Sequence, residues 1–299
     1  MDRSTRFGIA DQAIAIGFWI NAVLMIAKLL AGYLGQSEAV FADGMESACD
    51  FAAMLSAMIA LKIGRKPFDQ EHPYGHGKAE NIAAILVSLV IVATGFWILS
   101  RAVTTIMHRE AIEPQLFAVL IAAATIIIKE ALCRYTLSVS QRLGSPALDA
   151  IAKDHRKDAL TSVATLIGVA GAYFGVGLMD PLAAGLTAFF IFYIGWKTFR
   201  DATHDLMDGQ APREFIADVA AAIENVPGIE HIHEIRCRRS GQYLIIDLKL
   251  DMDPEMTVRQ SHKIATEVKR LIFCRFPNVG DVMVHVNPHA EEHEDLIRL

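Results

Sequence analysis

The chain has 299 residues, of which 53% are hydrophobic and 21% charged, and its mean hydropathy is +0.33. This composition is too apolar for an ordinary soluble protein of that length and is typical of a membrane protein. The formal net charge is −6 and the chain has no Lys/Arg-rich run, which argues against a nucleic-acid partner. The four cysteines are widely spaced without a CxxC pair, which indicates reduced thiols rather than a disulfide framework.

Apolar stretches close to the roughly 20 residues needed to cross a bilayer predict six transmembrane helices. They cover residues 12–34, 38–63, 80–106, 115–140, 148–176 and 181–199. Basic residues gather between the second and third stretches, at Lys62, Arg65, Lys66 and Lys78. Because cytoplasmic loops are enriched in Lys and Arg, this bias predicts that both termini are cytoplasmic. We therefore expect a multi-pass protein of the plasma membrane, which in a bacterium is the inner membrane.

The segment after Asp208 has the pattern of a small α+β domain. PREFIADVAAAIENV predicts an amphipathic helix, and the following residues predict two strands joined at Ser240 and Gly241. TVRQSHKIATEVKRLIFCRF predicts a second helix and DVMVHVN a last strand. The expected fold is thus an all-α six-helix transmembrane bundle over residues 1–208, followed by a cytoplasmic αββαβ domain of the ferredoxin or metallochaperone type over residues 209–299.

Two of the predicted spans carry paired acidic residues in their interiors. Glu46 and Asp50 are four residues apart in the second span, and Asp154 and Asp158 are four apart in the fifth. This spacing places each pair on one helix face, with Cβ atoms about 5–6 Å apart. At about 1.5 Å per residue the two pairs lie at similar depths. Since an ionisable group at mid-bilayer costs about 3 kcal/mol or more, we interpret the pairs as facing a common site for a divalent cation.

Neighbouring charges in these helices are interpreted as structural. Asp43 lies near the start of the second span, where a helix N-terminus favours a negative side chain. Lys129 and Glu130 lie near the end of the fourth span, where we expect them to reach the membrane surface or to pair with each other.

With its six spans, its acidic pairs and its αββαβ domain, the chain resembles the cation diffusion facilitator family over essentially its whole length. FDQEHPYGHGKAENIAAI is similar to the family's loop between the second and third spans, and KEALCRYTLSVSQRLGSPALDAIAKDHRKDALTS to its region from the fourth span into the fifth. The resemblance implies a homodimeric secondary transporter in the lipid bilayer, and not an enzyme. Such a protein exports a divalent metal ion from the cytoplasm in exchange for protons by alternating access, and needs no resident cofactor.

The resemblance also assigns residues to sites. It implies a transport metal site at Glu46, Asp50, Asp154 and Asp158, and a loop metal site at Asp69, His72 and His76. It implies a charge pair between protomers at Lys78 and Asp208. In the regulatory and dimerisation domain, 209–299, it implies a reduced metal site at His233, His262 and His285, because Lys249 and Asn287 replace a histidine and an aspartate of the family pattern. The loop and cytoplasmic sites would hold a structural or regulatory Zn²⁺ or Mn²⁺.

The donor atoms of the transport site favour a particular metal. His155 lies one position after the family's histidine, and one residue turns a helical side chain by about 100°, so we expect it to point away from the acids. An all-oxygen site favours Mn²⁺, with Fe²⁺ next, because imidazole would favour Zn²⁺. The alternatives are a Zn²⁺, Co²⁺ or Cd²⁺ exporter of the same family and a metal sensor that transports nothing. An intramembrane aspartyl protease is disfavoured, since a GxGD context is absent.

Overall fold

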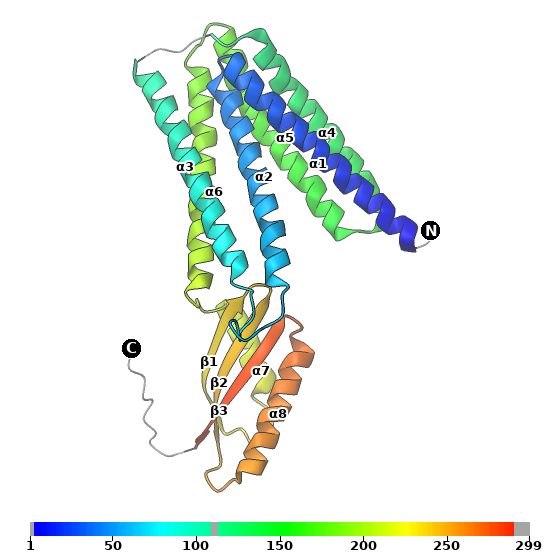
Figure 1. Ribbon diagram of the computed structural model, residues 1–299, viewed down its shortest axis with the longest axis vertical. Coiled ribbons are helices and arrows are strands. Elements are labelled where there is room, and N and C mark those ends of the chain that lie inside the picture. The colour runs from blue at the N-terminus through cyan, green and yellow to red at the C-terminus, as the bar shows by residue number, and fades with distance from the viewer. Residues whose placement is uncertain (1–2, 109–112, 290–299) are drawn as a thin grey trace. The chain divides into compact units, whose positions relative to one another are not determined.

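The computed structural model describes residues 3–108 and 113–289, and the chain divides into two compact units. The first unit contains residues up to 56 together with 86–198. The second contains residues 57–85 together with those from 199 onward. The elements of both units are labelled in Figure 1.

Six long helices make up the N-terminal part of the chain. They are α1 (Arg3–Leu34), α2 (Glu38–Gly64), α3 (Ala79–His108), α4 (Leu116–Leu143), α5 (Pro146–Tyr173) and α6 (Met179–Leu206). All except α5 are apolar and long enough to cross a membrane. The six predicted spans are therefore confirmed as helices. The exception has a physical reason, because the first half of α5 carries six charged residues, at Asp149, Lys153, Asp154, Arg156, Lys157 and Asp158.

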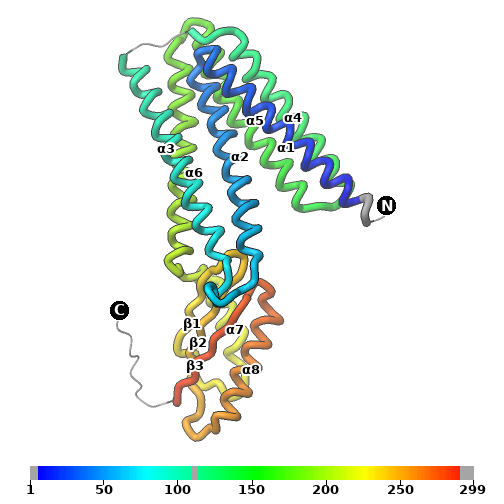
Figure 2. The backbone as a smooth tube through the Cα atoms, in the orientation of Figure 1, coloured from blue at the N-terminus to red at the C-terminus, as the bar shows by residue number. Residues whose placement is uncertain are grey.

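The helices of the first unit form two groups. In one, α1, α4 and α5 run side by side, as the backbone trace shows (Figure 2). In the other, α2, α3 and α6 share an apolar cluster that includes Cys49, Ile98 and Ile191. The groups meet at one end of the unit, where Val40 of α2 packs with residues of α1, α4 and α5. At the other end, the cluster of Ala13, Val139, Leu143 and Leu148 contains α1, α4 and α5 only.

The C-terminal part has the predicted αββαβ order. Its elements are α7 (Arg213–Ile223), β1 (His231–Ser240), β2 (Tyr243–Met252), α8 (Val258–Arg275) and β3 (Val279–Pro288). The sheet order is β1-β2-β3, with β1 antiparallel and β3 parallel to the central strand. A capping box starts α8, in which the Thr257 side chain accepts from the Gln260 backbone and the Gln260 side chain accepts from the Thr257 backbone.

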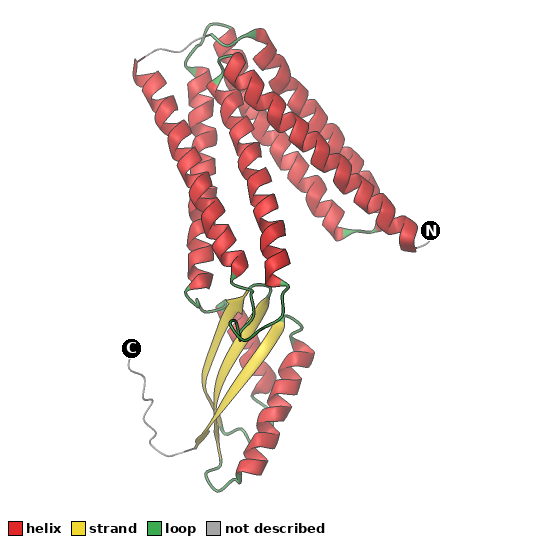
Figure 3. Ribbon diagram, viewed as in Figure 1, coloured by secondary structure: helices red, strands yellow, loops and turns green. Residues whose placement is uncertain are grey.

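One face of this sheet forms the core of the small domain. Alternate residues of β2, from Leu244 to Met252, pack against buried residues of α7 and α8 such as Val219 and Ile272. Both helices lie along the sheet in Figure 3. The intervening residues of β2, among them Lys249 and Asp251, have side chains on the opposite face, because successive strand residues alternate in direction. This opposite face, called here the polar face of the sheet, carries charged side chains of the strands.

Candidate metal sites

The acidic pairs of α2 and α5 lie in the first unit. Glu46 and Asp158 are half-buried, whereas Asp50 and Asp154 are exposed. The acids interact electrostatically across the two helices, Asp50 with Asp154 and Asp158, and Glu46 with Asp158. Their oxygens are not drawn together as bound ligands would be: among described residues, no group of three metal-ligand atoms within 4.8 Å of one another contains any of the four.

A lysine of α4 forms an ion pair with one of these carboxylates. Lys129 Nζ donates to Asp158 Oδ2 at 2.6 Å, and the Lys129 side chain is only 5% exposed. Of the two alternatives expected for Lys129 and Glu130, the structure does not show the pairing with each other, because Glu130 accepts from Arg134 at 2.8 Å and from Arg156 at 3.4 Å. Adjacent residues on a helix point about 100° apart, so the two side chains face different neighbours.

Asp43 belongs to a buried network that links three helices. Its Oδ1 accepts from Lys28 Nζ of α1 at 2.9 Å, and its Oδ2 accepts from Ser162 Oγ of α5 at 3.1 Å. Lys28 also donates to Ser47 Oγ at 3.2 Å. The structural role predicted for Asp43 therefore has a different cause. A buried ammonium, rather than the N-terminus of α2, balances the carboxylate.

His155 packs against another helix, and it also interacts electrostatically with Asp154 and Asp158 of its own helix. It is buried, and a Cβ added to Gly17 of α1 would lie 3.3 Å from its Nε2. Neither ring nitrogen has a hydrogen-bond partner. The one-residue offset from Asp154 therefore turns the imidazole toward the space that Gly17 leaves free.

The loop between α2 and α3 brings three potential ligands together in the second unit. Asp69 Oδ1 lies 3.3 Å from His72 Nδ1, and Asp69 Oδ2 lies 3.5 Å from His76 Nε2. All three ligand atoms lie within 4.8 Å of one another. The backbone N–H of His72 donates to Asp69 and, as the main cause, holds the pKa of this exposed carboxyl below its ordinary value. The side chain is thus an ionised ligand at neutral pH.

Lys78 and Asp208 form an ion pair in the same unit. Their Nζ and Oδ1 atoms lie 3.0 Å apart, and Arg238 Nη1 lies 3.3 Å from Asp208 Oδ2. The hydrogen bond from Lys78 is the main reason that the pKa of Asp208 lies below its usual range. The sequence-based prediction placed this pair between two protomers. In this single chain the two side chains lie within ion-pair distance of each other, and the pairing between protomers stays a prediction.

The three histidines predicted for the cytoplasmic domain do not gather. Among described residues, no group of three potential ligands within 4.8 Å contains His262, on α8, or His285, on β3. Lys249, the cation that departs from the family pattern, lies 3.0 Å from Glu234.

His233 instead groups with two residues that the sequence analysis missed. These are His231 and Asp251, and the ligand atoms of all three lie within 4.8 Å of one another. The alternating HIH pattern within a predicted strand was the available signal, because residues two apart in a strand lie on one face. The HIH pattern does not indicate that the third member of the group is Asp251 on β2.

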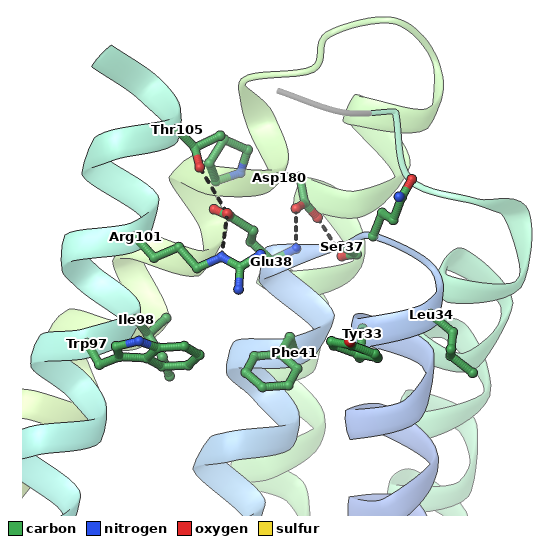
Figure 4. Close-up of a pocket in the computed structure, with 13 residues that line it drawn as sticks. Tyr33, Leu34, Ser37, Glu38, Phe41, Trp97, Ile98, Arg101, Thr105 and Asp180 are labelled. Atoms are coloured by element: carbon green, nitrogen blue, oxygen red, sulfur yellow. Dashed lines mark hydrogen bonds and ion pairs between the residues drawn. The ribbon is translucent and has the colours of Figure 1, made fainter. Parts of the chain in front are cut away.

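A pocket of about 630 Å³ lies where α1 joins α2, and Figure 4 shows its lining. Glu38 accepts from Arg101 Nε at 3.1 Å and from Thr105 Oγ1 at 2.9 Å, both on α3. Asp180 of α6 accepts from Ser37 Oγ and from the backbone N–H of Glu38, both at 2.6 Å. These bonds satisfy backbone donors at the start of α2 and attach it to α3 and α6.

Comparison with protein families identifies the family to which the chain belongs. Residues 14–207 match the model of the cation efflux transmembrane domain. The chain belongs to the cation efflux family. Residues 211–289 match the cytoplasmic domain of cation efflux proteins, so the αββαβ domain is the family's cytoplasmic domain. As a member of this family, which is also called the cation diffusion facilitators, the protein is a metal efflux transporter.

The cation efflux relatives include proteins named for manganese. The chain is 35% identical over 296 residues to manganese efflux system protein MneP of Bacillus subtilis, covering 97% of this chain and 99% of MneP. It is 32% identical over 270 residues to MneS of the same organism, covering 90% and 93%. It is also 34% identical over 288 residues to magnetosome protein MamM of Paramagnetospirillum magneticum, covering 94% and 88%.

Proposed function

We propose that this protein exports Mn²⁺ from the cytoplasm in exchange for protons, and that Glu46, Asp50, Asp154 and Asp158 are the transport ligands. The observation that carries the proposal is the set of four carboxylates on α2 and α5, which interact electrostatically across the two helices and include no nitrogen or sulfur donor. Carboxylate oxygens suit Mn²⁺, whereas a site with imidazole gives Zn²⁺ the advantage. Fe²⁺ is the next candidate.

Two further observations support manganese. The His155 imidazole packs against Gly17, and among the described residues it belongs to no group of three potential metal ligands, so it adds no nitrogen donor that would favour Zn²⁺. The relatives MneP and MneS, which match nearly the whole chain, are named as manganese efflux proteins.

Proton exchange follows from the charge of the empty site. When the metal leaves, four neighbouring carboxylates repel one another, and protons neutralise part of that charge. Metal and protons then occupy the site in alternation, which couples their movements. The exposure of Asp50 and Asp154 supports access to the site from one side in this conformation.

The remaining assignments complete the proposal. Residues 1–208 form the transport domain and 209–299 the cytoplasmic regulatory and dimerisation domain of a homodimer in the plasma membrane, with both termini cytoplasmic. The loop residues Asp69, His72 and His76 bind a structural or regulatory metal ion. The Asp69 carboxylate oxygens lie 3.3 Å from His72 Nδ1 and 3.5 Å from His76 Nε2, and these short distances support the role.

Transport into proteoliposomes tests the activity. We expect Mn²⁺ uptake to be accompanied by proton movement in the opposite direction, followed with a pH-sensitive dye inside the vesicles. Asp50→Asn should abolish both signals. Metal movement without any proton signal would rule out exchange, and an absence of metal movement in the wild type would leave a metal sensor as the better assignment.

A histidine substitution tests the metal preference. Asp154→His adds an imidazole at the proposed site and should shift competition between Mn²⁺ and Zn²⁺ toward Zn²⁺ by tenfold or more. Asp149→His is the matched control, because Asp149 lies on the same helix but pairs with exposed Lys153 at 2.7 Å. An equal shift in both variants, or none in either, would contradict the assignment of Asp154.

A further inference from the structure

Three side chains converge on one carboxylate oxygen at the polar face of the sheet. His231 Nδ1 lies 3.3 Å from Asp251 Oδ2, His233 Nδ1 lies 3.9 Å from it, and His289 Nδ1 lies 4.0 Å from it. Tetrahedral ligands at bonds of about 2.1 Å lie roughly 3.4 Å from one another. The ligand atoms of His231, His233 and Asp251 all lie within 4.8 Å of one another, which is wider than a closed coordination shell, and His289 is not part of that group.

The backbone explains why these histidines meet. His231 is the direct cross-strand partner of Asp251. The pairing then shifts between Ile232 and Glu234, which places His233 at a bulge. A bulge re-aims the side chain of its extra residue, and here it keeps His233 within reach of Asp251. The backbone N–H of His289 donates to Met252 O at 2.7 Å, which holds the fourth group beside the strand end.

A neighbouring amide orients the carboxylate. Asn287, the partner of Asp251 on β3, donates from Nδ2 to Asp251 Oδ1 at 3.3 Å. The other oxygen, Oδ2, is the one that faces the imidazoles. Both Asp251 and Asn287 are buried, whereas His231 and His233 are exposed enough to exchange an ion with solvent. Residues that do not bind the metal themselves but fix the orientation of a metal ligand by a hydrogen bond are typical of metal sites in proteins.

We propose that His231, His233 and Asp251, with His289 as a fourth ligand, bind a divalent transition-metal ion of the Zn²⁺ type. Imidazole nitrogens dominate this donor set, so it ranks Zn²⁺ above Mn²⁺, the reverse of the all-oxygen transport site. His262 and His285 are not ligands of this site. The inference does not depend on which metal is exported.

Co²⁺ titration of the purified full-length protein tests the site, since Co²⁺ bound by nitrogen and oxygen ligands absorbs visible light. An Asp50→Asn/Asp158→Asn/His72→Ala/His76→Ala background removes two of the four proposed transport carboxylates and two of the three proposed loop ligands. In that background we expect one Co²⁺ to bind, to be displaced by Zn²⁺, and to bind at least tenfold more weakly after His231→Ala or Asp251→Asn.

The controls are His262→Ala and His285→Ala, which remove the histidines that the sequence alone had favoured. Both should bind Co²⁺ as the parent does. Equal binding by His231→Ala and the parent would overturn the proposal, and so would a loss in either control as large as that of His231→Ala. Equal thermal midpoints in EDTA show that the His231→Ala chain is folded, and Asp251→Asn, which keeps its size, gives a second measurement.

The buried ion pair in the first unit carries a second, independent inference. Lys129 Nζ sits 2.6 Å from Asp158 Oδ2, so an ammonium already occupies an oxygen that the proposed function gives to the metal. A metal ion at the same oxygen would face a cation at contact distance in a poorly hydrated setting, where like charges repel strongly. The ammonium must therefore move away before or while the metal binds.

We infer that Lys129 is a tethered counter-ion that competes with the transported metal for Asp158 and stabilises the metal-free carrier. Lys28 does not serve the same purpose, because Asp43 holds it at 2.9 Å outside the set of four acids. The inference rests on the proposed function in one respect only, the assignment of Asp158 as a ligand. Lys129 is a positioning residue, since it acts through that carboxylate.

Mn²⁺ binding to the detergent-purified protein, measured by isothermal titration, separates competition from a merely structural role. If Lys129 competes, Lys129→Met should bind Mn²⁺ at least fivefold more tightly, whereas the loss of a structural contact would weaken binding. Lys129→Arg, which keeps the charge, should bind no more tightly than wild type. Arg134→Met is the matched control, because it removes one charge from the same helix but from a pair with Glu130.

Asp158→Asn distinguishes failure of this inference from failure of the proposed function. Unchanged Mn²⁺ binding in Asp158→Asn would remove Asp158 from the transport site. Weakened binding in Asp158→Asn together with unchanged or weaker binding in Lys129→Met would overturn only the role of Lys129. If Lys129→Met does not fold, Lys129→Gln, which still offers an amide donor to Asp158, should show the same tighter binding.

Discussion

At the scale of single residues, the first unit balances its buried charges with lysines from neighbouring helices. Lys28 is 2% exposed and Asp43 4% exposed, which places both partners of this pair out of reach of bulk solvent. A buried pair of this kind contributes little net stability, but loss of one partner leaves a charge that nothing compensates. The pair lies one helical turn from Glu46 on α2, so it also sets the surroundings of the acidic residues.

Removing Lys28 should therefore destabilise the protein strongly. We expect Lys28→Met to cost about 3–5 kcal/mol, because it leaves Asp43 buried and unpaired, and Lys28→Met/Asp43→Asn to recover much of that loss. Thermal unfolding in detergent measures both. Lys153→Met is the control, since its pair with Asp149 is exposed and should be worth less than about 1 kcal/mol. Similar losses for the two single variants would contradict the importance of burial.

At the scale of elements, glycines determine how closely the helices of the bundle approach. A Cβ added to Gly95 of α3 would lie 2.8 Å from the backbone nitrogen of Phe192 on α6. In return, a Cβ on Gly195 of α6 would lie 2.9 Å from Ile91 and 3.0 Å from the backbone nitrogen of Val92, both on α3. Small residues allow such close backbone contact between membrane helices, where packing rather than hydrophobic burial drives association.

Gly95→Ala should consequently force α3 and α6 apart. We expect a loss of about 1–3 kcal/mol, the usual cost of overpacking, despite the higher helix propensity of alanine. Gly8→Ala in α1 is the matched control, because nothing lies within 4 Å of the added atom. Thermal midpoints of the two variants provide the comparison, and a Gly95→Ala midpoint at or above wild type would show that the helices have room to spare.

At the scale of the whole molecule, the proposed topology orders the loops on the two sides of the membrane. The link between α5 and α6 has no basic residue, whereas that between α2 and α3 is rich in them. The rule that places basic loops in the cytoplasm therefore puts the α5–α6 link outside and the α2–α3 link inside.

Cysteine labelling of whole cells tests this topology. Three of the four native cysteines are buried and only Cys274 is exposed. The Cys274→Ser variant should therefore react little with maleimide and serves as the parent for the test. In that background Val176→Cys should react with a membrane-impermeant maleimide added outside, and Glu71→Cys should react only after the membrane is permeabilised. Both positions are exposed in the structure. Reaction of Glu71→Cys in intact cells would reverse the proposed orientation.

The sequence by itself determined the elements of this protein. Apolar length predicted the six helices, strand alternation and amphipathic spacing predicted the αββαβ order, and the four-residue spacing put each acidic pair on one face of its helix. The loop residues Asp69, His72 and His76 came instead from the resemblance to the cation diffusion facilitator family. The periodic signals are local, because helical and strand periods act over a few residues, and a short loop likewise keeps its own side chains close.

Only the tertiary structure decided which partners the polar side chains have. Lys28 meets Asp43 across 15 positions of the chain, Lys129 meets Asp158 across 29, and His231 meets Asp251 across 20. The sequence analysis expected Lys129 to reach the membrane surface or to pair with its neighbour Glu130, and it grouped His233 with His262 and His285. Those choices differ from the structure because helix packing and strand register select the partner of a buried charge, and neither leaves a periodic signal in the chain.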